Sequence, residues 1–469
     1  LDVVPNLRPN ATSSRLSPVR AAIAHQHLKR CLPALPGFER LQKWRTSHAG
    51  AVADDQGVMV RFLAERFERD VLAIDAGATH TVLQTQASGH YSQVVLTGLG
   101  TKEGSSDLVD TVGAESITRW LPFEITPTAL ENRLLNRQLW PHLPPTDLDE
   151  LLLDHALVRE AIGAGLTAMR ETRAALHYDM VVAGGVLARS PHPAYAALTL
   201  LDTLLSDEHR SHFAIDLYLD RFGLLATSGA LARINPDAAV CLLERDGLSN
   251  GPLATVVLPH GDLIAGRLAL QVELTPVGGE PEWIEVQGGS IARIALPRGR
   301  RGTLRIRPAG GVRIGPNAPG AEVLSDEAAI SGSALGVIVD ARPRPLSLPP
   351  APAERAALFR EWLDALGAPP PRESTSMQVA IESPSGPADV VSSVATDFPK
   401  GKSLPVAKIY DRRPADPAVP PPAPEIHPTP DGNAAGAAPV DSYDLDPIAQ
   451  DHVEPAERPR RRGFLRRRR

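Results

Sequence analysis

Residues 71–84 combine an apolar run, an acidic residue and a turn of small residues, and this arrangement restricts the local fold strongly. The run 71–74 leads straight into Asp75, and a second apolar stretch begins at Thr81. Short apolar runs bounded by small turn residues are typical of a β-hairpin. A Walker-type phosphate loop is excluded, because it would open into a helix and carry Gly-Lys-Ser/Thr. We therefore expect strand, turn and strand, with a further strand at residues 91–96.

The residues of this turn are suited to binding phosphate. The backbone N–H groups of Gly77 and Ala78 and the hydroxyls of Thr79 and Thr81 can hold phosphate oxygens. The carboxylate of Asp75 can hold a hydrated Mg²⁺, which prefers carboxylate and phosphate oxygens. The pattern D-x-G-x-T-x-T alone still favours an ordinary hairpin that binds nothing.

Two later segments strengthen the nucleotide interpretation. A strand that ends at Gly184 and Gly185 and enters a helix can lay a flat nucleobase on bare backbone, although close helix–strand packing explains the same glycine pair. A second strand at 214–220 is followed by an apolar helix at 224–234. A long helix precedes both, and Thr146 and Asp149 give it an S/T-x-x-D/E start signal. Together these elements follow the order of the second half of an actin-like nucleotide-binding fold.

The composition divides the chain into three predicted regions. Residues 1–250 read as an α/β nucleotide-binding region, and residues 251–367 as a β-rich domain, a small sandwich or barrel with a closing helix. Residues 368–469 hold many of the 45 prolines and end in a run of arginines, so we predict a disordered tail. The arginines can contact an anionic surface, or they simply keep the tail solvated.

Charge and cysteine content exclude several classes of protein. A formal charge of −6 argues against a chain that binds nucleic acid over a basic face. Two cysteines can form neither a disulfide framework nor a structural zinc site. No apolar run is long enough for a membrane span, and no signal peptide is visible, so we expect a soluble, cytoplasmic protein.

At this level of detail the sequence resembles the MutL proteins associated with adenosylcobalamin-dependent glutamate mutase, which share only a name with the mismatch-repair protein. The resemblance covers about residues 1–366. The segments that carry it are Val4–Asn6, Asp75–Thr81, Arg119–Pro122, Asn136 with Pro141, Gly184–Leu187, Leu219–Asp220, Gly223–Ala226 and Val337–Leu346. Two departures stand out: Ala78 replaces the family's second hairpin glycine, and Pro343 stands at a glycine position of the last segment.

The resemblance implies an ATPase of the actin-like (ribonuclease H-like) class that uses ATP and Mg²⁺ and acts as a reactivating or assembly chaperone for a cobalamin-dependent mutase. Asp75 would position Mg²⁺ or the attacking water. Residues 77–79 and Thr81 would hold phosphates, while Gly184 and Gly185 would face the adenine. Because only one such hairpin is present, we expect an N-terminally incomplete chain that lacks most of the first lobe. No D-x-H-x-x-G signature is present, so direct binding of cobalamin and mutase activity are not expected.

Two other functions stay open. A binding scaffold could keep the fold without hydrolysing nucleotide, and the substitution at Ala78 is compatible with it. A small-molecule kinase of the sugar-kinase type is the third interpretation, although no acidic base is paired with a polar sugar pocket.

Remaining polar groups have structural explanations. We interpret Asp340, Arg342 and Arg344 as a turn held by an ion pair at the edge of the β-rich domain. His80 reads as a satisfied, non-catalytic histidine. The apolar face of Leu151, Leu152, Leu157 and Ile162 is predicted to belong to the core, and Glu103, Asp107 and Asp110 are predicted to be solvated.

Overall fold

The computed structural model describes most of the chain up to residue 369. The described ranges are 3–10, 17–44, 50–171, 176–204, 213–248 and 251–369. The predicted disorder of the Pro-rich tail therefore lies almost wholly outside the described residues.

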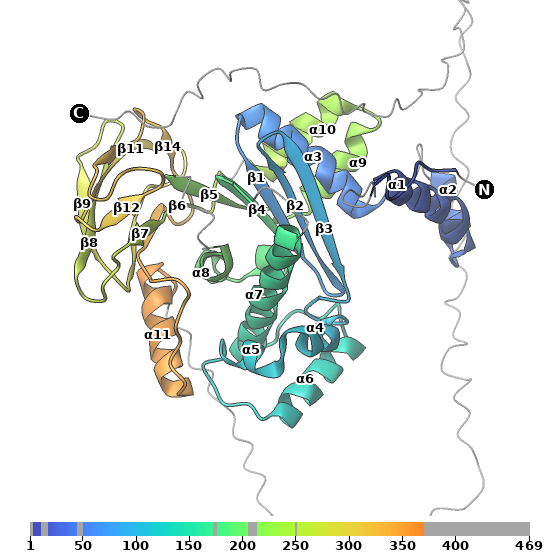
Figure 1. Cartoon of the computed structure of the whole chain (residues 1–469), viewed down its shortest axis with the longest axis horizontal. Helices are drawn as coiled ribbons and strands as arrows, with labels where there is room; N and C mark the ends of the chain where they lie inside the picture. Colours follow the sequence, from blue (N-terminus) through green and yellow to red (C-terminus); the bar gives the residue numbers. More distant parts are fainter. Residues whose placement is uncertain are drawn as a thin grey trace, which may run out of the picture. The chain divides into compact units, whose positions relative to one another are not determined.

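A mixed eight-stranded sheet forms the centre of the described fold (Figure 1). In spatial order its strands are β10 (Ile291–Ile294), β15 (Val337–Asp340), β6 (Ala254–Val257), β5 (Ala214–Leu219), β4 (Met180–Gly185), β1 (Val71–Ala76), β2 (His80–Ala87) and β3 (His90–Thr97). Strands β1, β4 and β5 are parallel, and β2 and β3 continue from β1 as an antiparallel meander. The predicted hairpin and third strand are thus confirmed, as is the mixed α/β class.

Alternate residues of β1 enter two separate cores. Leu72 and Ile74 pack on one face with α7 (Leu148–Glu171), whereas Val71 and Ala73 pack on the other with α3 (Val52–Phe67). Because successive side chains of a strand point to opposite faces, a continuous apolar run indicates a strand that is covered on both sides. Strand β1 is therefore covered by a helix on each face of the sheet.

The other helices flank this sheet or precede it in the chain. Before β1 lie α1 (Ser17–Gln26), η1 (His27–Cys31), η2 (Leu32–Ala34) and α2 (Phe38–Trp44). Between β3 and α7 lie α4 (Ser105–Val112), α5 (Ala114–Thr118) and α6 (Pro127–Leu139). After β4 come η3 (Leu187–Arg189), α8 (Pro193–Leu204), α9 (Leu224–Ala232), α10 (Pro236–Leu242), η5 (Leu243–Gly247) and α11 (Pro352–Ala365). None of the described helices is long and apolar enough to cross a membrane.

A smaller antiparallel sheet packs on a second core, which it shares with β6, β10 and β15. It contains β13 (Val323–Leu324), β11 (Arg301–Pro308), β8 (Leu268–Pro276), β9 (Glu282–Gln287) and β14 (Ile330–Ser331), and β7 (Pro259–Gly261) pairs with β12 (Val312–Ile314) nearby in sequence. Strands β6, β10 and β15 of the same region instead join the eight-stranded sheet. Strand pairing therefore crosses the boundary predicted near residue 250, while the predicted domain division itself stays a prediction.

Helix α7 begins one residue later than its sequence signal suggests. The carboxylate Oδ1 of Asp147 accepts a hydrogen bond of 2.8 Å from the backbone N–H of Glu150, which is the geometry of an N-cap residue. The cap is therefore Asp147 and not Thr146, whose hydroxyl lies 3.5 Å from the other carboxylate oxygen of Asp147. Both residues are good caps, and only the structure distinguishes them.

A buried ion cluster joins the end of β15 to α7 and α8. Asp340 accepts hydrogen bonds from Arg342 (2.8 and 2.9 Å) and Arg344 (2.6 Å). Asp202 in turn accepts from Arg342 and Arg159, each at 2.8 Å. We call these five residues the closed cluster. The predicted ion pair is confirmed, but it lies buried against α8, because Asp202 on that helix completes it.

Candidate functional site

The tip of the β1–β2 hairpin is a tight turn that is held by its own backbone. The N–H of Gly77 donates a 3.0 Å hydrogen bond to the carbonyl of His80. This bond closes the turn that the sequence predicts between Asp75 and Thr81. The N–H group of Gly77 therefore already has an acceptor within the turn.

A glycine-rich loop after β3 packs against this tip. The N–H groups of Thr101 and Lys102 donate to the carbonyls of Gly77 (3.0 Å) and Ala78 (2.9 Å). A Cβ on Gly100 would lie 2.3 Å from the carbonyl oxygen of Ala78, so only glycine allows this approach. The loop thereby places the side chain of Lys102 beside the hairpin.

The glycine pair at the end of β4 lies next to β1. Gly184 pairs with Asp75 and Gly185 with Ala76 in the parallel register. Gly185 has φ +63°, and a Cβ there would meet the carbonyl oxygen of Ala76 at 2.1 Å, whereas a Cβ on Gly184 would make only ordinary contacts at 3.6 Å. The close approach of β4 to β1 therefore explains why position 185 is glycine, whereas the alternative open from the sequence was close helix–strand packing.

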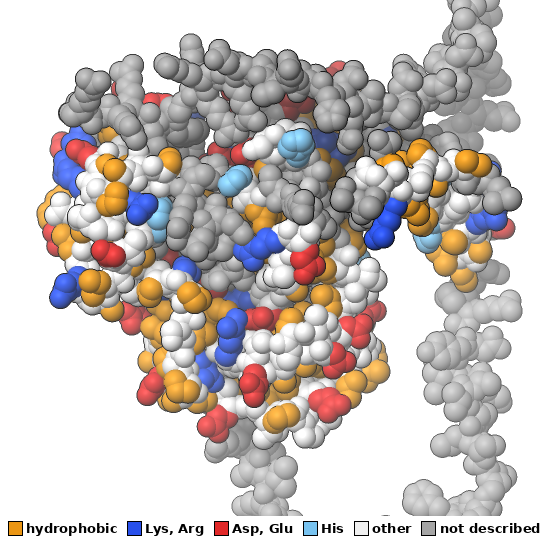
Figure 2. Space-filling model, in the orientation of Figure 1, with side chains coloured by type: hydrophobic (Ala, Val, Ile, Leu, Met, Phe, Trp, Pro, Cys, Tyr) orange, Lys and Arg blue, Asp and Glu red, His pale blue; other side chains and the backbone are white. Residues whose placement is uncertain are grey.

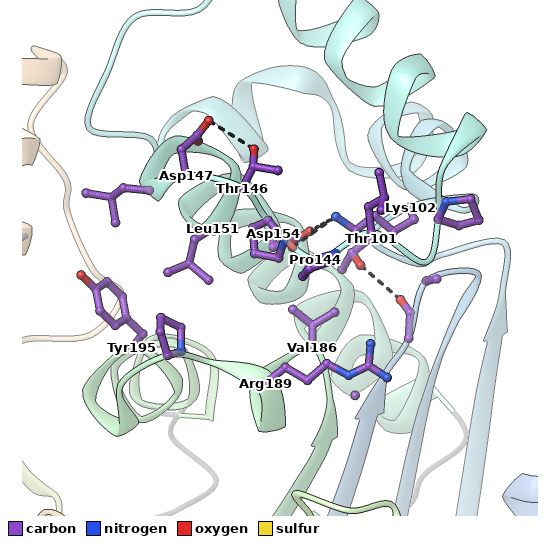
Figure 3. Close-up of a pocket in the computed structure, with 18 residues that line it drawn as sticks. Thr101, Lys102, Pro144, Thr146, Asp147, Leu151, Asp154, Val186, Arg189 and Tyr195 are labelled. Atoms are coloured by element: carbon purple, nitrogen blue, oxygen red, sulfur yellow. Dashed lines mark hydrogen bonds and ion pairs between the residues drawn. The ribbon is translucent and has the colours of Figure 1, made fainter. Parts of the chain in front are cut away.

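A cavity of about 500 Å³ lies at the carboxyl ends of β1 and β4 (Figure 3). This edge is where parallel sheets commonly bind ligands. The apolar lining of the cavity consists of Pro141, Leu143, Pro144, Pro145, Leu148, Leu151, Val186, Pro191 and Tyr195. The remaining residues, called the polar lining, are polar or present bare backbone: Gly77, Ala78, Thr101, Lys102, Thr146, Asp147, Asp154, Gly185 and Arg189.

Charged side chains gather in the polar lining and next to it. The ammonium of Lys102 lies 3.3 Å from both carboxylate oxygens of Asp154, and Arg137 hydrogen-bonds the same carboxylate. Arg137 also lies 3.5 Å from Glu150. We call Lys102, Arg137, Glu150 and Asp154 the cavity cluster. Burial, together with the positive charge of Arg137, lowers the pKa of Lys102 to about 8.

Three of the seven residues predicted from the sequence line the cavity: Gly77, Ala78 and Gly185. Thr81 is fully buried, and its hydroxyl donates to the carbonyl of Leu99 at 2.8 Å. Thr79 is exposed, and its hydroxyl donates to Glu103. Gly184 is buried behind the strand end. The ligand-binding roles of all seven residues stay predictions.

Asp75 lies at the same strand end but faces the α3 side of the sheet. Its Oδ2 accepts a 3.2 Å hydrogen bond from the side chain of Gln56 on α3. Burial raises the pKa of this carboxyl, and the positive charge of Arg189, which lines the cavity, acts in the opposite direction. Since Mg²⁺ needs only one or two protein carboxylates beside phosphate oxygens and water, a single carboxylate here fits such an ion. The described residues contain no group of three His, Cys, Asp or Glu that could hold a metal by themselves.

Sequence reasoning missed the charged residues of the polar lining. Lys102 and Asp154 are 52 residues apart in the chain, and neither belongs to the hairpin motif. The repeated glycines at 98, 100 and 104 around Thr101 and Lys102 were the available signal, because close backbone approach needs them. Leu151, expected to be core, is buried and also contributes to the cavity wall.

A family model described as MutL protein matches residues 1–246. The matched span exceeds half of the chain and contains every residue that lines the cavity. No curated protein matches the chain.

Proposed function

The chain belongs to the MutL family associated with glutamate mutase, and from that membership we propose that it binds ATP with an actin-like lobe and remodels or reactivates a cobalamin-dependent mutase. The observation that carries the proposal is the cavity of about 500 Å³ at the carboxyl ends of β1 and β4. Its volume suits a drug-sized ligand. Its apolar lining suits a base, and its polar lining suits a charged group.

The strand order supports the same proposal. An antiparallel meander β3-β2-β1 followed by β4 and β5, both parallel to β1, is the arrangement expected for one actin-like lobe. In such a lobe, the first hairpin and the end of the following parallel strand approach the same ligand. Here Gly77 and Gly185 both line the cavity, which brings these two elements together.

The bound Mg²⁺ would supply positive charge to the phosphate oxygens. Asp75 is the residue that would hold it, because its carboxylate is half-buried and has one side-chain partner, Gln56. Nearby Asp220 is committed elsewhere, since its two oxygens accept from the N–H groups of Leu224 (2.7 Å) and Leu225 (3.0 Å) at the start of α9. Asp75 is thus the carboxylate that we propose for the ion.

The test is release of inorganic phosphate from Mg-ATP by the full-length protein. We expect turnover in the wild type and its abolition by Asp75→Ala, because the ion or attacking water would lose its carboxylate. Asp110→Ala is the matched control, since Asp110 is exposed on α4 and does not line the cavity. Unchanged turnover in Asp75→Ala would remove that role from Asp75, and phosphate release without an added acceptor separates an ATPase from a kinase.

A second candidate function, a scaffold that binds without hydrolysis, is favoured by one set of contacts. The N–H of Gly77 and the hydroxyl of Thr81 already donate within the protein. These groups would have to break internal bonds before they could hold a phosphate. Binding of Mg-ATP to the full-length protein with no phosphate release would select the scaffold.

A further inference from the structure

The cavity cluster contains one carboxylate that is shared by two cations. Arg137 hydrogen-bonds Asp154 through Nη2, and Lys102 lies 3.3 Å from each of its oxygens. Arg137 comes from α6 behind the cavity, whereas Lys102 belongs to the loop at the hairpin. Asp154 therefore keeps a positive partner even when Lys102 is elsewhere.

Only one of these two cations lines the cavity. Lys102 and Asp154 belong to the cavity wall, and Arg137 does not. In Figure 3, a dashed line joins the Lys102 side chain to Asp154, and the Arg189 side chain lies beside Val186. Arg189 is exposed, and no carboxylate among the described residues forms an ion pair with it. Two cationic side chains thus line the cavity.

We propose that Lys102 is the anion-binding residue of this cavity. When a ligand binds, the ammonium of Lys102 gives up its contact with Asp154 and contacts a phosphate group of the ligand, while Asp154 stays paired with Arg137. Lysine is suited to this role because its ammonium is a compact charge on a flexible side chain. It can change partners without the fixed planar geometry that a guanidinium requires. The proposal deepens the proposed function by adding a phosphate contact from outside the hairpin, and it rests on that function only where the phosphate belongs to ATP.

The surroundings of Lys102 explain why an anion is favoured there. The charged groups near it are Asp154 and Glu150 on α7 and Arg137 on α6, and Asp147 and Arg189 line the same cavity. The pKa of Lys102 is lowered to about 8 by burial and by Arg137, so its charge is incompletely compensated. A bound phosphate would favour the ammonium, and its affinity should fall as the pH rises above about 8.

The experiment measures binding of inorganic pyrophosphate, Mg-ATP and adenosine to the full-length protein by titration calorimetry. For Lys102→Met we expect the affinity for pyrophosphate and Mg-ATP to fall by about 10- to 100-fold, the loss expected for one charged hydrogen bond. Adenosine carries no phosphate, so its affinity should not change. Lys102→Arg should restore most of the loss, and Lys43→Met, at an exposed lysine of α2, should behave as the wild type.

Each outcome separates this inference from the proposed function. Binding of Mg-ATP that is equal in the wild type and Lys102→Met overturns the role of Lys102 and leaves nucleotide binding intact. Binding of pyrophosphate that depends on Lys102, with no binding of Mg-ATP, supports the inference and contradicts the nucleotide proposal. No binding of pyrophosphate to the wild type overturns the inference.

A second measurement covers the case in which Lys102→Met fails to fold. The wild-type protein is acetylated with and without pyrophosphate, and modification of Lys102 is read by peptide mass spectrometry. We expect pyrophosphate to protect Lys102 and to leave Lys43 as reactive as before. Equal acetylation of Lys102 under both conditions would contradict the proposal.

Discussion

The closed cluster and the cavity cluster are built from the same kinds of ions but differ in what surrounds them. In the closed cluster, Arg342 and Asp202 are almost fully buried, and their contact is 2.8 Å. The guanidinium of Arg342 also lies 4.2 Å from the ring centroid of Trp362 on α11. In the cavity cluster the corresponding cation is an ammonium, its contacts are 3.3 Å, and it faces a cavity.

This difference shows that a shared buried carboxylate does not by itself indicate a binding site. Asp340 and Asp154 each serve two cations. A planar guanidinium that forms several short bonds and stacks on an aromatic ring is held in one geometry. A lysine at a cavity wall has longer bonds and space to move. The first arrangement suits a structural link between elements, and the second suits a ligand contact. On the face drawn in Figure 2, basic and acidic side chains are interspersed.

The largest effect should follow from opening the closed cluster. Arg342→Met removes the cation between Asp340 and Asp202 and leaves two buried carboxylates with fewer partners. We expect a loss of about 3–5 kcal/mol in the free energy of unfolding, the usual cost of breaking a buried ion pair on one side. Urea denaturation of the two proteins measures it. Arg344→Met should lose less, because that side chain is 19% exposed. A loss below about 1 kcal/mol for Arg342→Met would show that the two clusters do not differ in this way.

The sequence indicated only the local half of the closed cluster. Asp340, Arg342 and Arg344 lie within five residues, so their spacing alone predicts an ion-paired turn. Asp202 and Arg159 come from α8 and α7, more than a hundred residues earlier in the chain. No local pattern indicates that these helices meet β15. The same holds for Lys102 and Asp154, whereas the hairpin, the glycine pair and the strands were predictable because neighbouring residues encode them.

The stability of the protein at acid pH should show how well the region around the closed cluster excludes water. His155 on α7 is buried between Thr199 (2.6 Å) and Ser190 (3.2 Å), and burial, with the positive charge of nearby Arg159, lowers its pKa to about 3. The unfolded chain binds a proton near pH 6.5, but the folded chain does not until about pH 3. Stability should therefore fall with falling pH across this window.

By pH 5, protonation of His155 in the unfolded chain should lower the free energy of unfolding by about 2 kcal/mol. The measurement is the free energy of unfolding by urea from pH 8 to pH 5, compared between the wild type and His155→Gln. His142→Gln is the control, because His142 is exposed. The difference between the wild type and His155→Gln should shrink or reverse toward pH 5. A difference that stays constant with pH would mean that water reaches His155, and the contrast between a dry and an open cluster would be lost.

The smallest effect should come from Lys102→Met, the counterpart of Arg342→Met in the cavity cluster. Asp154 keeps Arg137 as a partner, and the substitution removes an ammonium whose pKa is lowered by burial to about 8. We expect the free energy of unfolding at pH 7 to change by less than about 1 kcal/mol, since replacing a poorly compensated buried charge by an apolar group is often neutral. Lys43→Met is the control.

The difference in stability between the wild type and Lys102→Met should also depend on pH. Between about pH 8 and 10.5 the unfolded chain keeps the proton of Lys102 and the folded chain releases it. The wild type should therefore gain stability relative to Lys102→Met as the pH rises through this window. A loss of several kcal/mol in Lys102→Met at pH 7 would instead make Lys102 a structural partner of Asp154, equivalent to Arg342. The ammonium could then not leave its carboxylate for a ligand, because the fold would need it in place.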